Sequence, residues 1–197
     1  MGEEPPALTG RAEQMARSLR AALRARGMAP DEQDAVLRVF SLAMAPRLAM
    51  LDDGHHPAWL HPGRSALILL HDVEPVDPAV LIVAALHESL DSHLRLPLPE
   101  VERNVGSATA QALRQIPMPG DERLVERLLL LGPGLALAAL AERLDQLRHL
   151  HLRDDVIEHW ADIHTEVSTA WLPFAARTDG TLGRRYAHWV RTFARRV

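Results

Sequence analysis

The chain has 197 residues, no cysteine and a formal net charge of −4 at pH 7. This length corresponds to one domain with a sizeable core, and 47% hydrophobic with 24% charged residues excludes wholesale disorder. The lack of cysteine excludes disulfides, thiolate chemistry and cysteine-bound zinc. All 22 basic residues are arginines, which excludes Schiff-base chemistry and a phosphate loop that needs lysine. The negative charge gives no global attraction for nucleic acid.

No targeting or membrane-spanning segment is evident. The first residues, Met-Gly-Glu-Glu-Pro-Pro, lack the basic start and the apolar stretch of a signal peptide. The longest apolar runs, residues 66–70 and 128–131, are far too short to cross a bilayer. We therefore expect a cytoplasmic protein that binds neither membranes nor nucleic acid.

The hydrophobic pattern is helical nearly everywhere, and no stretch alternates with the period of a half-buried strand. Capping residues, prolines and glycines mark the expected helix ends. Helices are predicted over residues 10–26 (capped by Thr9), from Asp31 to a kink or end at Pro46, and over 62–71, 78–91, 99–115, 121–131, 134–151, 154–177 and 186–197. The pattern predicts a single all-α bundle, with an N-terminal helical extension over residues 1–34 and the main helical domain over 35–197.

Residues suited to metal chemistry occur on three of these helices. His61 begins one helix, His87 and Glu88 lie near the end of another, and Glu142 lies on a third. Two imidazoles and two carboxylates suit a divalent transition ion with open positions for water and substrate. An ion held in this way lowers the pKa of bound water and neutralises a phosphoryl oxygen.

Periodicity alone favours a plainer interpretation of the third helix. Glu142, Asp145 and His149 share one face by their spacing. Leucines at positions 137, 140, 144 and 147 form an apolar stripe opposite to that face. This pattern is typical of a surface helix with a solvated charged face. A His-Glu dipeptide near a helix end likewise most often lies on the surface or at the helix cap and binds no ligand.

Three motifs in order resemble the HD-domain hydrolases. They are His-Pro at 61–62, Ala-Ala-Leu-His-Glu at 84–88 and Leu-Ala-Glu-Arg-Leu at 140–144. The resemblance spans about residues 35–177 and is closest to the ppGpp hydrolase domain of RelA/SpoT enzymes and to the small alarmone hydrolases. It implies an HD-domain-like helical bundle. It also implies a divalent ion, first of all Mn²⁺, on a ligand set of two histidines and two glutamates: His61, His87, Glu88 and Glu142.

The same resemblance implies a reaction and a substrate class. Asp91 would position or deprotonate the attacking water, beside the metal ligand Glu88. Arg143, Arg64 and Gln146 would contact the substrate. That substrate would be a small nucleotide phosphate or pyrophosphate ester, with ppGpp as the first candidate.

Departures from the family pattern leave a second hypothesis open. The two metal-binding aspartates of the family fall on Glu88 and Glu142, and a second catalytic carboxylate falls on Ser92. The basic cluster upstream of the His-Pro motif is reduced to Arg47. The alternative is therefore a catalytically degenerate HD domain that binds a ligand or partner. A third hypothesis is a structural module that forms a homodimer through its Trp-containing C-terminal helices.

One further dipeptide matches the family only superficially. His71 and Asp72 form a literal His-Asp pair, but they follow His61 too closely for an intervening helix and turn. We expect a structural role here, with Asp72 or Asp77 capping the next helix.

Overall fold

The computed structural model describes residues 7–51, 55–153 and 158–194. All regular elements in this part of the chain are helices, which confirms the all-α prediction. They are α1 (Gly10–Ala25), α2 (Pro30–Met50), α3 (His61–Asp72), α4 (Pro78–Leu86), α5 (Leu98–Asn104), α6 (Ser107–Gln115), α7 (Leu124–Leu129), α8 (Pro133–His149), α9 (Trp160–Glu166), α10 (Leu172–Thr178) and α11 (Gly180–Phe193). Shorter elements lie between them, among these the 3-10 helices η1 (Ser92–Leu94) and η2 (Leu150–Leu152) and the π-helix η4 (Val167–Trp171). Across the described ranges, no helix combines the length and apolarity needed to cross a membrane.

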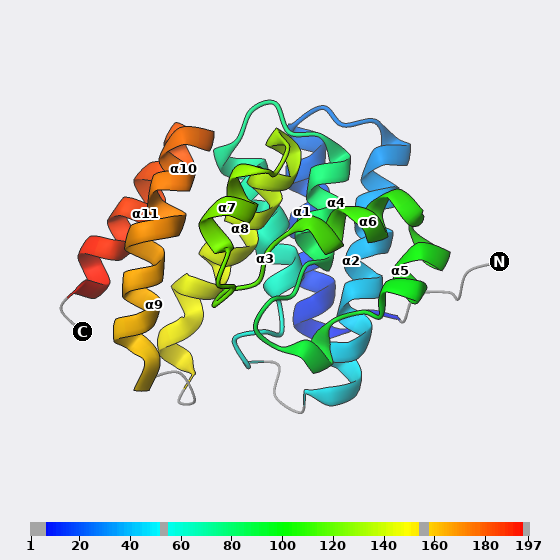
Figure 1. Ribbon diagram of the computed structural model, residues 1–197. Helices are drawn as coiled ribbons and strands as arrows, with labels where there is room; N and C mark the ends of the chain where they lie inside the picture. Colours follow the sequence, from blue (N-terminus) through cyan, green and yellow to red (C-terminus); the bar gives the residue numbers. More distant parts are fainter. Residues whose placement is uncertain (1–6, 52–54, 154–157, 195–197) are drawn as a thin grey trace.

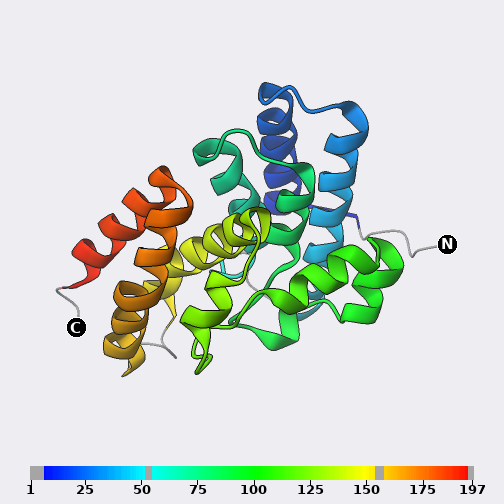
Figure 2. The ribbon, with the colours of Figure 1, turned by 45° about the horizontal axis from the view of Figure 1, so that its top comes forward.

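Helix α8 lies in the middle of the molecule, between α1–α6 on one side and α9–α11 on the other (Figures 1 and 2). It packs against α3, α4, α10 and α11. Its neighbour α4 is apolar along its length and also packs against α2 and α3. Because α8 has neighbours on opposite sides, both of its faces are buried in the middle of the helix. The leucine stripe is therefore only one of its two packed faces.

The N-terminal helix shares this core. Leu19 and Leu23 of α1 are fully buried, and α1 packs against α2 and α3. The predicted boundary between residues 34 and 35 falls inside α2.

Several predicted helix ends differ from the observed ones in the N-terminal two thirds of the chain. Ala29, rather than Asp31, is the N-cap of α2. The helix also continues past Pro46, and the buried Arg47 side chain ties its last turn to backbone carbonyls nearby. The helix predicted over 99–115 is two helices, since Gly106 has a φ of 117°, which only glycine tolerates readily.

The C-terminal helices also differ from the prediction. The residues of the predicted 154–177 helix form α9, η4 and α10, and positions 154–157 lie outside the described residues. The last helix begins at Gly180, six residues before the predicted start at 186. Asp179 explains this start, because its carboxylate accepts hydrogen bonds from the backbone N–H groups of Thr181 and Leu182, both at 2.8 Å.

Candidate metal centre

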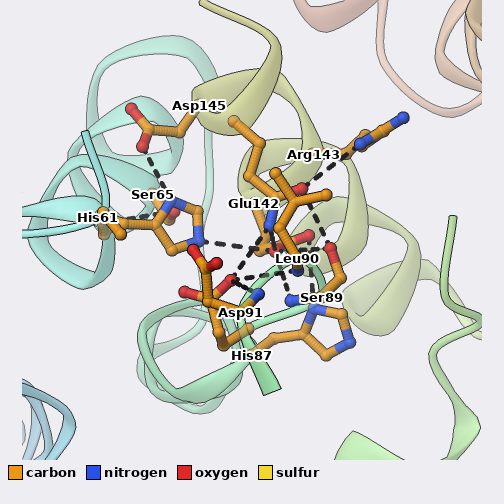
Figure 3. Close-up of polar contacts among 12 residues, drawn as sticks. His61, Ser65, His87, Ser89, Leu90, Asp91, Glu142, Arg143 and Asp145 are labelled. Carbon is orange, nitrogen blue, oxygen red and sulfur yellow. Dashed lines mark hydrogen bonds and ion pairs between the residues drawn. The ribbon is translucent and has the colours of Figure 1, made fainter. Parts of the chain in front are cut away.

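Three of the four predicted ligands, His61, Glu88 and Glu142, come together between α3, α8 and the loop after α4. Figure 3 shows His61 and Glu142 in this region, with His87 beside Glu142. His61 is the first residue of α3, His87 directly follows α4, and Glu142 lies in the middle of α8. All four side chains, including that of Glu88, are buried. One ligand atom from each of His61, Glu88 and Glu142 lies within 4.8 Å of the other two. His87 borders this group through Glu142.

The loop that contains His87 and Glu88 differs from the prediction. The helix predicted over 78–91 ends at Leu86, because His87 has an extended backbone with a ψ of 128°. Glu88 then holds the turn itself: its Oε1 accepts hydrogen bonds from the backbone N–H groups of Leu90 (3.1 Å) and Asp91 (3.2 Å). The early helix end carries Glu88 and Asp91 across the end of α4 toward α8.

His61 is oriented by a carboxylate behind its ring. Its Nδ1 donates a hydrogen bond to Oδ2 of Asp145 at 2.8 Å, and Arg64 in turn donates to the same carboxylate at 2.8 Å. This leaves Nε2 of His61 facing Glu142 at 3.5 Å, with no hydrogen-bond partner. A carboxylate that fixes the outer nitrogen of an imidazole is the usual support of a metal-binding histidine.

His87 shows the same lack of partners more fully. Its Nδ1 lies 3.3 Å from Oε2 of Glu142, in a geometry that makes no hydrogen bond. Neither ring nitrogen has a hydrogen-bond partner among the described residues, although the side chain is only 3% exposed. Buried polar atoms are nearly always satisfied. Each of the two imidazoles thus has a buried ring nitrogen without a hydrogen-bond partner, and such nitrogens beside the Glu142 carboxylate fit a divalent ion.

In the part of the chain that the structure describes, the imidazoles of His61 and His87 are the basic groups within ion-pair distance of the Glu142 carboxylate. Its Oε1 accepts hydrogen bonds from Ser89 Oγ (3.0 Å) and Gln146 Nε2 (2.5 Å), both uncharged groups. Burial alone would raise the pKa of Glu142, but the neighbouring His87 and His61 hold it well below its usual range. Burial alone would lower the pKa of His61, but the neighbouring carboxylates of Asp145 and Glu142 raise it to about 10. A proton on His61 therefore balances Glu142 when no ion is bound.

Glu88, in contrast, has a permanent cation of its own. Its Oε2 accepts a hydrogen bond from Nη2 of Arg47 at 2.5 Å, and the Arg47 side chain is only 2% exposed. Arg47 also donates to the carbonyl oxygens of Ala58 and Ala43, both at 2.8 Å. Arg47, to which the basic cluster of the family is reduced, is thus a buried partner of Glu88.

A small cavity borders the centre, with a volume of about 20 Å³. This is room for about one water molecule or ion. Asp91 lines the cavity, and its Oδ2 accepts a hydrogen bond from Arg153 at 2.8 Å. The predicted catalytic carboxylate is therefore next to the candidate metal position.

The predicted substrate-binding residues are engaged within the protein. Gln146 lines the cavity, but its Nε2 joins the carboxylates of Glu142 (2.5 Å) and Glu88 (3.4 Å). Arg64 also lines the cavity, with its guanidinium bound to Asp145. Arg143 does not line it: its Nη2 donates to Glu166 at 3.0 Å, so Arg143 links α8 to α9.

The structure also places residues that the pattern misjudged. Asp145 is fully buried, so the expectation of a solvated face on α8 is wrong there and at Glu142. The spacing could have indicated this, since Asp145 follows Glu142 by about one helical turn and therefore lies on the same face of α8. The His-Asp dipeptide lies at the end of α3, where Asp72 pairs with Arg185 at 2.5 Å. Asp77 caps α4 as expected, accepting a hydrogen bond from the N–H of Ala79 at 2.7 Å.

The comparisons with known proteins give no relative. No family model matches the chain, and neither a search of curated proteins nor a search of solved structures finds a match. The resemblance to the HD-domain hydrolases therefore remains a prediction from the three motifs.

Proposed function

We propose that the chain is a metal-dependent phosphohydrolase of the HD type that acts on a nucleotide phosphate or pyrophosphate ester. One observation carries this proposal. The buried imidazoles of His61 and His87 have nitrogens without hydrogen-bond partners, and those nitrogens lie 3.5 and 3.3 Å from the carboxylate of Glu142. Such a set of free nitrogen and oxygen donors supports a site for a divalent cation.

His61, Glu88 and Glu142 would hold the ion, with His87 as the adjacent fourth donor. Imidazole with carboxylate oxygen suits Mn²⁺ among other first-row ions. When bound, the ion would polarise a phosphoryl oxygen and lower the pKa of a bound water. Asp145 keeps the His61 ring in place, and Ser89 with Gln146 keeps Glu142 in place, so the donors are preorganised.

Asp91 is the group that would act on the water. Its carboxylate faces the small cavity and is held by Arg153. As the water oxygen attacks phosphorus, a water proton passes to Asp91 and the bond from phosphorus to the leaving oxygen breaks. The cavity has room for about one water molecule at this position.

The test is a hydrolysis panel of nucleotide mono-, di- and triphosphates and 3′-pyrophosphorylated nucleotides, with Mn²⁺ added. The parent protein should release phosphate or pyrophosphate from at least one of them, and His87→Ala should not. Asp91→Asn should keep its bound Mn²⁺ and lose about 10²-fold or more in turnover, as expected for removal of a general base. Release by the parent at no more than the rate of His87→Ala would contradict the proposal.

A second candidate function has its own observation. The Arg47 guanidinium already neutralises Glu88, and this pairing favours a catalytically degenerate domain that binds a ligand or partner without turnover. The same nucleotides then bind with equal affinity to the parent and to His87→Ala, without Mn²⁺ and without hydrolysis. Equilibrium dialysis with EDTA distinguishes the two candidates, since the phosphohydrolase proposal predicts metal uptake that depends on His87.

A further inference from the structure

A larger cavity lies on the other side of the loop that follows α4. Its volume is about 190 Å³, nearly ten times that of the cavity beside His61. It is formed by the end of α4, the segment around η1 and the helices α5, α6 and α7 (green in Figures 1 and 2). His87 and Glu88 line it at one end, so it adjoins the candidate metal centre.

Three arginines give this cavity a positive character: Arg95, Arg114 and Arg127. Arg127 pairs with the carboxylate of Asp121. Within the described residues, no carboxylate pairs with Arg95 or Arg114. Arg95 is held in place by an uncharged contact, a hydrogen bond from its Nε to the carbonyl oxygen of Glu88 at 2.8 Å. Two guanidinium groups are thus available to an anion here.

Glu88 does not cancel this positive charge, since Arg47 neutralises its carboxylate. The unpartnered ring of His87 lies at the same end of the cavity. The rest of the lining is apolar and comes from Leu86, Leu96, Leu98, Leu113, Ile116 and Met118. The cavity therefore combines positively charged groups with an apolar wall, as a site for an organic anion requires.

We propose that this cavity is a binding site for an organic phosphate, with Arg95 and Arg114 contacting the phosphate group. The apolar wall would receive the organic body of the molecule. Arginine suits this task because its planar fork of N–H donors matches phosphate oxygens. Beside His61, about 20 Å³ leaves no room for such a molecule, so the substrate would approach the centre from the side of His87. That last step rests on the proposed function, whereas phosphate binding needs no turnover.

The test uses the full chain, freed of metal with EDTA, and isothermal titration with inorganic phosphate and with phenyl phosphate. Phenyl phosphate should bind more tightly than inorganic phosphate, because it also contacts the apolar wall. Arg114→Gln should weaken phenyl phosphate binding about fivefold or more, as expected for the loss of one charge-assisted contact. Arg114 is exposed on α6, so this variant keeps the fold. Arg95→Gln should have a similar effect.

Arg103→Gln is the matched control, because Arg103 is exposed on α5 and does not line the cavity. It should change phenyl phosphate binding by less than about twofold. Equal losses in Arg114→Gln and Arg103→Gln, or no saturable binding by the parent, would overturn the proposed site. A Mn²⁺ titration of the same samples separates the two proposals. If the protein binds phenyl phosphate but takes up no Mn²⁺, only the proposed metal centre is refuted. If it takes up Mn²⁺ but Arg114→Gln does not weaken phenyl phosphate binding, only this phosphate site is refuted.

Discussion

Glu88 and Glu142 enter the candidate centre from different regions, and each is neutralised in a different way. Glu88, in the loop after α4, pairs with the guanidinium of Arg47 and accepts backbone hydrogen bonds. Glu142, in the middle of α8, has only uncharged hydrogen-bond donors and the two imidazoles of His61 and His87. The first region is complete without an ion, whereas the second depends on a proton or a metal. Glu142 and the two histidines therefore form the part of the centre that an ion would complete.

The largest expected effect is on the region of Glu88, which is neutralised without an ion. Arg47→Met removes the fixed cation and leaves Glu88 charged and buried, so the free energy of unfolding should fall by about 3–5 kcal/mol. Urea unfolding followed by circular dichroism measures this change. Arg103→Met, on an exposed helix face, is the control and should stay within about 0.5 kcal/mol of the parent. A similarly small loss in Arg47→Met would show that the Arg47–Glu88 pair does not hold the loop.

The region of Glu142 and the two histidines is tested by changing Asp145, which orients His61. Asp145→Asn weakens the hydrogen bond that orients the imidazole, and Mn²⁺ affinity should fall about 10- to 100-fold. Electron paramagnetic resonance of free Mn²⁺ gives the dissociation constants. Asp162→Asn changes a carboxylate on α9 away from the centre and should leave the affinity unchanged. If the Mn²⁺ affinity of Asp145→Asn is also unchanged, Asp145 does not orient His61 for metal binding.

The proton that stands in for an ion predicts a pH dependence. The pKa of His61 is raised from 6.5 to about 10 in the folded protein, so its protonated form stabilises the fold fully below pH 6.5. This contribution is lost as the pH rises from 6.5 toward 10. In EDTA-treated protein the free energy of unfolding should fall over this window, by at most about 1.4 kcal/mol per pH unit. Saturating Mn²⁺ should reduce the slope, because the ion takes the place of the proton.

Urea unfolding at several pH values between 6.5 and 9.5 measures that slope. His61→Gln should flatten it. His93→Gln, at an exposed position in η1, serves as the control and should leave it as in the parent. If both variants retain the slope of the parent, the proton resides elsewhere.

The smallest expected effect lies outside both regions. Glu166 accepts hydrogen bonds from Arg143 and from Trp171 Nε1, each at 3.0 Å. Glu166→Gln should lower the free energy of unfolding by about 1 kcal/mol, since it weakens a partly exposed charged contact. Mn²⁺ affinity should not change. A loss of Mn²⁺ binding in Glu166→Gln would contradict this, and would show that the Arg143–Glu166 pair supports the metal centre.

The sequence predicted the helical class, because helical periodicity is a local pattern. Its motifs also named His61, Glu88 and Glu142 as candidate ligands, and the structure brings these three side chains together. That they bind a metal stays a prediction. Helical periodicity is visible residue by residue, and Glu142 stands in a motif with recognisable neighbours. Long-range contacts are not visible in this way. The pairing of Arg47 with Glu88 joins residues 41 positions apart, and the burial of Asp145 depends on α3 packing against α8. Periodicity could not tell a solvated charged face from a buried polar one, because the two have the same spacing.

The loop after α4 was also beyond local patterns. The pattern predicted one helix over residues 78–91, but the helix ends at Leu86. The loop that follows is held by contacts of Glu88 with Arg47 and with the backbone N–H groups of Leu90 and Asp91. Without that loop, Asp91 would not reach the cavity. The arginines around the second cavity come from separate segments, so no spacing in the sequence indicates them.

The most direct test of the account is Mn²⁺ binding by the parent protein and by Glu142→Gln, measured together. The isosteric change keeps the shape of the side chain but removes the charge that faces the imidazoles of His61 and His87. Glu102→Gln, on the exposed face of α5, is the matched control. The account predicts about one Mn²⁺ per chain in the parent and in the control, and none in Glu142→Gln at the same concentrations. Equal Mn²⁺ binding in all three proteins, or none in the parent, would contradict it.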